Sequence, residues 1–189
     1  TLNLSNQKLT DLSSLKGMTQ LRELNIQNNK ITLTDEDKQI IKSMNQLKYL
    51  YMQNNEIEDI SFLNECKSVK ALGIAGNNKI DLKQIEDIIS NMSPIRISQE
   101  QLDTLKNCDA SKITKLALDY SGITSIPDLS RYTKLTTISL NTSNGISDFS
   151  NILTAPNLES VTIIACDMHN KMVDFSQLSN LKQLTLNGN

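Results

Sequence analysis

The chain has 189 residues, a formal net charge of −2 and a sequence pI of about 5.4, so it lacks the basic field typical of nucleic-acid-binding proteins. No segment approaches the roughly 18 consecutive apolar residues that a membrane-spanning helix needs. Three widely spaced cysteines and a single histidine argue against a disulfide framework and against a histidine-rich metal site. We therefore expect no nucleic-acid partner, no membrane insertion, no metal and no cofactor.

A repeated spacing of aliphatic residues and asparagine runs from the start of the chain to its end. Residues 21–31 have the pattern L-x-x-L-x-L-x-x-N-x-L, with isoleucine in two of the leucine slots, and residues 47–57 repeat it. Because Leu2–Leu9 and Leu181–Asn189 are partial repeats, we count nine strand units. The opening slot recurs every 21 to 26 residues, at Leu21, Leu47, Val69, Met92, Ile113, Leu135, Leu158 and Leu181.

The repeat predicts one short strand in each coil. Side chains alternate along a strand, so Leu24 and Ile26 should point inward while their neighbours point to solvent. Stacked strands would form a parallel sheet with a spacing of about 4.8 Å. The asparagine slot falls where the chain turns, and its amide can bond backbone groups that would otherwise be unpaired or meet the asparagine of the next coil. We expect a looser ladder in the second half, because the slot reads Gln7, Asn29, Asn55, Asn77, Glu100, Ser121, Ser143, Cys166 and Asn189.

The segments that return to the next strand also repeat. Residues 55–63 have the form N-x-I-x-D-I-S-x-L, and residues 9–15 and 123–129 are close variants. These segments resemble the bacterial internalin-type leucine-rich repeat, whose return side uses short 3₁₀ turns; the wider repeat class includes intracellular phosphatase regulators. The resemblance implies an α/β fold: a right-handed, horseshoe-like leucine-rich-repeat solenoid with a parallel concave sheet.

Three return segments depart from this pattern and favour α-helices. Residues 34–44 begin with a threonine cap and three acids, and residues 81–90 carry apolar side chains at helical spacing. Residues 99–107 are a weaker candidate. Asn78 and Gly145, or a neighbour of Gly145, read as one-residue insertions that shift Ile80 and Ile146 into the next core slot. We expect one array over residues 1–189 that is an excerpt of a longer protein, since neither end carries a polar cap.

The outward slots of the sheet contain three of the four tyrosines. Tyrosine and arginine are enriched at binding hot spots, and the small outward residues from Ala71 to Gly76 should leave a shallow depression beside Tyr49 and Tyr51. The competing interpretation is that tyrosine is simply a good strand former at a half-exposed position. The predicted partner-binding residues of the concave face are Arg22, Tyr49, Tyr51, Arg96, Asp119 and Tyr120.

Other reactive residues favour structural roles. Cys166 occupies an asparagine slot as a small filler, and Cys66 and Cys108 lie on return segments of different coils. His169 lies near Asp167 but has no nucleophile placed with it, so we predict no enzymatic activity. The acids at 35–37 lack the ligand spacing of a calcium loop and fit the first turn of a helix.

These features predict a module that binds another protein. The internalin resemblance implies the recognition or adhesion region of a bacterial protein that is secreted or held at the cell surface, with a host surface protein or a glycan as partner. One alternative is a cytoplasmic regulatory scaffold like the phosphatase regulators. Another is a substrate-selecting domain of an enzyme whose catalytic part lies outside this sequence.

Overall fold

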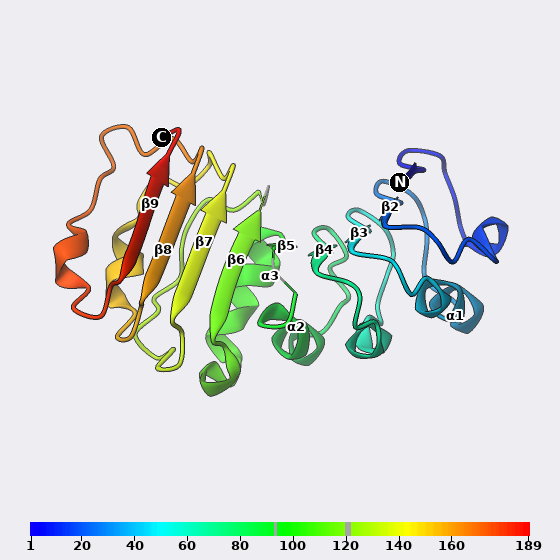
Figure 1. Ribbon diagram of the computed structural model, residues 1–189, viewed down its shortest axis with the longest axis horizontal. Coiled ribbons are helices and arrows are strands. Elements are labelled where there is room, and N and C mark those ends of the chain that lie inside the picture. The colour runs from blue at the N-terminus through cyan, green and yellow to red at the C-terminus, as the bar shows by residue number, and fades with distance from the viewer. Residues whose placement is uncertain (93, 120–121) are drawn as a thin grey trace. The chain divides into compact units, whose positions relative to one another are not determined.

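One short strand forms in each predicted repeat, and a 3₁₀ turn or an α-helix follows in most return segments. The computed structural model describes residues 1–92, 94–119 and 122–189. It divides into two units, residues 1–94 and residues 95–189. Parallel strands, 3₁₀ turns and three α-helices confirm the predicted α/β repeat architecture (Figure 1).

The first unit stacks four short parallel strands. Leu24 of β2 is in register with Leu50 of β3, which is in register with Leu72 of β4, and all three leucines are fully buried. The hydrogen-bond ladder continues past the strands, because the Ile26 amide donates to the Tyr51 carbonyl at 2.8 Å. The unit contains β1 (Leu2–Asn3), β2 (Glu23–Asn25), β3 (Tyr49–Tyr51), β4 (Ala71–Gly73), α1 (Asp35–Ser43), α2 (Leu82–Ile89) and 3₁₀ turns at Ser13–Leu15 and Ser61–Glu65.

The second unit stacks five parallel strands, and the last four are five residues long. Leu116, Ile138 and Val161 lie in register from β6 to β8 and form one buried column, and Leu184 of β9 continues the register at the exposed end of the stack. Figure 1 shows these four strands side by side. The unit contains β5 (Ile95–Arg96), α3 (Gln99–Thr104), β6 (Lys115–Asp119), β7 (Thr137–Asn141), β8 (Ser160–Ile164), β9 (Gln183–Asn187) and 3₁₀ turns at Leu105–Asn107, Ala110–Lys112, Ser150–Thr154 and Phe175–Gln177.

All three predicted helices are present, and polar side chains fix where they begin. The Thr34 hydroxyl accepts a bond from the Asp37 amide, and the Asp37 carboxylate accepts one from the Thr34 amide at 2.9 Å, which makes a capping box for α1. Asp37 also accepts the Leu12 amide of the previous coil at 2.7 Å. Asp81 caps α2, and Ser98 with Gln101 forms a second capping box at α3. Acids 35–37 thus lie in the first turn of a helix, as predicted.

The asparagine slot works as a ladder in the first unit. The Asn29 carbonyl oxygen accepts the amides of Gln7 and Leu9, each at 3.0 Å, and its amide nitrogen donates to the Leu4 carbonyl at 2.9 Å. The Asn55 carbonyl oxygen likewise accepts the Ile31 amide. Each of these asparagines therefore closes the turn of its own coil and also bonds the backbone of the coil before it.

The ladder changes in the second unit. The prediction that Glu100 fills the slot is wrong, because α3 begins at Gln99 and Glu100 lies exposed within that helix. Ser121 lies outside the described residues. The buried Ser143 hydroxyl has no hydrogen-bond partner in the described part of the chain, and the Ser143 amide reaches the Cys166 sulfur at 3.5 Å. The predicted loosening of the asparagine ladder is confirmed at Ser143 and Cys166.

An Asp-x-Ser pattern fixes the return turns. In each case the aspartate carboxylate accepts the amide of the serine two residues later, for example at 2.9 Å between Asp59 and Ser61. These bonds stabilise the ionised carboxylate and lower its pKa. The pattern occurs at Asp11–Ser13, Asp59–Ser61, Asp109–Ser111, Asp128–Ser130, Asp148–Ser150 and Asp174–Ser176.

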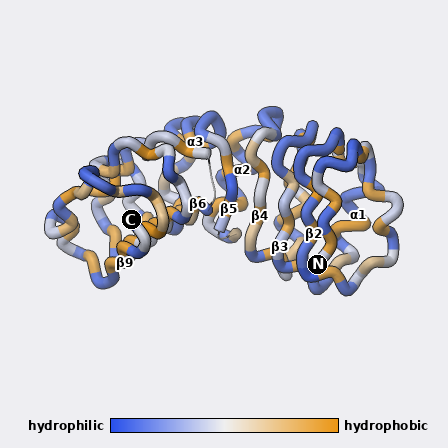
Figure 2. Tube along the Cα trace, turned by 90° about the horizontal axis from the view of Figure 1, so that it is seen from above, coloured by the Kyte–Doolittle hydropathy of each residue, from blue (hydrophilic) through white to orange (hydrophobic). Residues whose placement is uncertain are grey.

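The apolar residues face the interior of each unit. In Figure 2, hydrophilic and hydrophobic stretches alternate along the chain. This alternation is expected of stacked coils, because each coil turns one of its sides toward the interior. Ile80 and Ile146, which follow the two predicted insertions, are both buried. Within residues 1–92, 94–119 and 122–189, no helix has the length and apolar character needed to cross a membrane.

Candidate binding face

The exposed strand face of the first unit presents two columns of side chains. Glu23 and Tyr49 lie in one column, and Asn25 and Tyr51 lie in the next, because each pair is in register across β2 and β3. Tyr49 is 43% exposed and Tyr51 is half-buried. Arg22 precedes β2 and is exposed. The sheet therefore holds three of the six predicted residues, Arg22, Tyr49 and Tyr51, on the first unit.

Two of the small residues expected to leave a depression beside the tyrosines are covered. Gly73 and Ala71 are both buried, with only 1% of Ala71 accessible. The Gln53 side chain lies over Gly73, where it is 8% exposed, and a Cβ atom at position 73 would overlap its amide. Glycine at position 73 thus makes room for the Gln53 side chain. The sequence pattern did not identify Gln53 as a residue that covers this face. The Gln53 Oε1 atom has no hydrogen-bond partner within the described ranges.

The exposed face of the second unit has a different chemistry. Arg96 on β5 and Asp119 on β6 are both half-buried, and the predicted Tyr120 lies outside the described residues. From β7 to β9 the outward side chains carry no charge. They are Thr137, Ser139, Asn141, Ser160, Thr162, Ile164, Gln183, Thr185 and Asn187.

Comparison with known families agrees with this geometry. Residues 1–36 and 45–90 match the family model for leucine-rich repeats, which describes two copies of the repeat. The matched segments contain the in-register strands β1 to β4 and their asparagine ladder. Residues 1–36 and 45–90 therefore consist of leucine-rich repeats.

Solved leucine-rich-repeat structures resemble this one at low sequence identity. Internalin C2 from Listeria monocytogenes is 21% identical with a TM-score of 0.49, over 98% of this chain and 79% of that one. The functional domain of InlJ from the same organism is 21% identical with a TM-score of 0.42, over 99% and 44%. The Drosophila Toll–Spatzle complex contains a chain that is 16% identical with a TM-score of 0.48, over 96% and 29%. None of the curated proteins compared with the sequence matches it.

The thiols of the chain are poorly suited to nucleophilic chemistry. Cys66, Cys108 and Cys166 form no disulfide in the described part of the chain. Burial raises the pKa of the Cys66 thiol and that of Cys166, which favours the protonated form of each. Among the residues that the structure describes, no group of three His, Cys, Asp or Glu side chains could hold a metal ion.

Proposed function

We propose that this chain is a leucine-rich-repeat protein-binding module that docks its partner on the exposed strand face. The observation that carries the proposal is the presentation of Tyr49 and Tyr51 on neighbouring columns above a fully buried layer. Their backbone is held in register on both sides, by β2 and by β4. Rings on a rigid sheet lose little conformational entropy on binding, which makes them efficient contact residues.

The interpretation of these tyrosines as plain strand formers accounts less well for Tyr49. A strand former contributes by packing against its neighbours. Tyr49 leaves 43% of its surface accessible, and its column partners are Glu23 and Ala71. Arg22 lies beside this surface, and on the second unit Arg96, Asp119 and Tyr120 stay candidates for contact with a partner.

We further propose that the module is the recognition or adhesion region of a bacterial protein that is secreted or held at the cell surface. The return segments at 9–15, 55–63 and 123–129 support this setting, because they resemble internalin-type repeats. A host surface protein is the proposed partner. The second candidate is a cytoplasmic scaffold. The lack of a disulfide among the described cysteines is equally compatible with a reducing compartment and with a surface protein that does not use disulfides.

Substitution of the two tyrosines tests the proposal. Purified host surface proteins would be screened with the immobilised wild-type chain, and the affinity of each captured protein would be measured. Y49A/Y51A should keep the wild-type melting temperature within a few degrees and weaken binding by about tenfold or more, since hot-spot side chains each contribute on the order of 1–2 kcal/mol.

The matched control removes exposed apolar side chains that lie outside the strands. Met18 is 43% exposed and Met172 is 65% exposed. M18A/M172A should bind the partner like the wild type. Equal affinity of Y49A/Y51A and the wild type for every captured protein would refute the proposed face.

A further inference from the structure

Three cations occupy one slot in three successive coils of the first unit. Arg22, Lys48 and Lys70 each follow the opening aliphatic residue of their repeat. The Lys48 amide donates to the Arg22 carbonyl at 2.8 Å, and the Lys70 amide donates to the Lys48 carbonyl at 2.9 Å. The three residues, which we call the basic row, therefore stack one per coil at the spacing of parallel strands, about 4.8 Å.

In the described part of the chain, no side chain of the basic row forms an ion pair with a carboxylate. All three side chains are exposed. Some other lysines of the same unit do form ion pairs: Lys38 lies 2.7 Å from Asp59, and Lys79 lies 2.6 Å from Glu58. Because like charges in adjacent positions of a sheet destabilise it, the row does not serve folding, and its charge is available to an anion.

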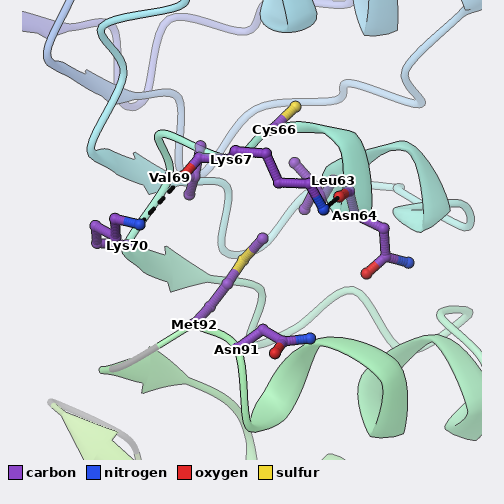
Figure 3. Close-up of a pocket in the computed structure, with 8 residues that line it drawn as sticks. All are labelled: Leu63, Asn64, Cys66, Lys67, Val69, Lys70, Asn91 and Met92. Atoms are coloured by element: carbon purple, nitrogen blue, oxygen red, sulfur yellow. Dashed lines mark hydrogen bonds between the residues drawn. The ribbon is translucent and has the colours of Figure 1, made fainter.

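Lys70, the last residue of the basic row, also lines a pocket of about 210 Å³. Lys67 and Lys70 line it together with Asn64 and Asn91, and no acidic residue does. Figure 3 shows the Lys67 ammonium on the Asn64 carbonyl and the Lys70 ammonium on the Lys67 carbonyl. An ammonium group has three hydrogens, so both lysines keep donors for a carboxylate.

Apolar side chains form the other walls of this pocket. Leu63, Val69 and Met92 line it, and Met92 approaches from the segment after α2 (Figure 3). A glutamate side chain has a short aliphatic arm that fits such walls and a carboxylate that fits the two lysines. A sulfated sugar offers no aliphatic arm. The pocket therefore favours an acidic peptide.

We propose that the basic row and this pocket bind an acidic, extended segment of the partner protein. The proposal rests on the proposed function and adds the partner's chemistry to it. Tyr49 directly follows Lys48, so acidic side chains of the segment meet the row while its other residues contact the rings. Charge complementarity of this kind raises the association rate and selects the partner.

A labelled deca-glutamate peptide is the probe, with fluorescence anisotropy as the measurement. R22Q/K48Q/K70Q should bind the peptide about tenfold more weakly than the wild type at low salt. Wild-type binding should also weaken as salt approaches about 0.15 M, because exposed charges are screened. K16Q/K79Q/K83Q is the matched control: it removes the same charge from exposed lysines outside the basic row and should change affinity by less than about twofold.

Three results would overturn the inference. Equal losses in the two triple variants would show that only net charge matters. A heparin-derived oligosaccharide of equal charge that bound the wild type about tenfold more tightly than the peptide would assign the row to a polysaccharide. A captured partner that R22Q/K48Q/K70Q retains and Y49A/Y51A loses would refute the acidic segment and leave the proposed function intact.

Discussion

At the scale of single residues, the buried asparagines of the first unit determine how the coils close. Asn55 accepts the Ile31 amide at 3.1 Å and donates to the carbonyls of Ile26 and Met52 at 3.0 and 2.9 Å. A smaller side chain would leave all three backbone groups without this partner. Buried groups that lose a hydrogen bond are costly, at about 1–3 kcal/mol each.

Asn55→Ala should therefore lower the free energy of unfolding by about 3–4 kcal/mol, since the local backbone and water satisfy some of the freed groups. Urea titration followed by circular dichroism measures the change. Asn45→Ala, at an exposed asparagine, should cost less than about 0.5 kcal/mol. If both variants lost the same stability, the ladder would not have the role assigned to it.

At the scale of elements, the sequence predicted where helices replace 3₁₀ turns. Thr34 and the apolar spacing of 81–90 marked α1 and α2, and both helices begin within two residues of the prediction. Glu100 was placed wrongly because two local signals compete at that point: the Ser98–Gln101 capping box starts a helix where the repeat expects an asparagine turn. Propensity and capping thus predict most elements, and the failure falls where helix and turn signals overlap.

The return turns should make stability sensitive to acid. Lys38, at 2.7 Å, together with the Ser61 hydroxyl and amide, lowers the pKa of Asp59 from 3.8 to about 2. A carboxylate with a lowered folded-state pKa stabilises the protein above its unfolded pKa of about 3.9 and loses that effect as the pH falls. The wild type should thus melt above Asp59→Asn at pH 6, and the difference should shrink between about pH 4 and pH 2.

Melting temperatures across this range test the assignment. In a Lys38→Gln background, the difference in melting temperature between the chain with Asp59 and the chain with Asp59→Asn should be smaller, because the Lys38 ammonium is the largest cause of the lowered Asp59 pKa. A gap between the wild type and Asp59→Asn that stayed constant down to pH 2 would contradict the account of this turn.

At the scale of the whole molecule, periodicity predicted the buried columns and the outward slots, but not how the outward side chains cover one another. Leu24, Leu50 and Leu72 form a column because a fixed repeat brings them to equivalent positions. The Gln53 amide over Gly73 depends on rotamers and on the size of one neighbour in the next coil, which a repeat pattern does not encode. The basic row was present in the sequence as a recurring slot, but its lack of acidic partners became visible only in three dimensions.

The central claim is that the exposed strand face, and not the return side, meets the partner. Hydroxyl-radical footprinting of the chain with and without a captured partner tests it most directly, because tyrosine and methionine are both oxidised and can be quantified in one experiment. We predict protection of Tyr49 and Tyr51 on binding, with no change at Met18 and Met172, which are exposed outside the strands. Protection of Met18 or Met172 with unchanged oxidation of both tyrosines would contradict the account.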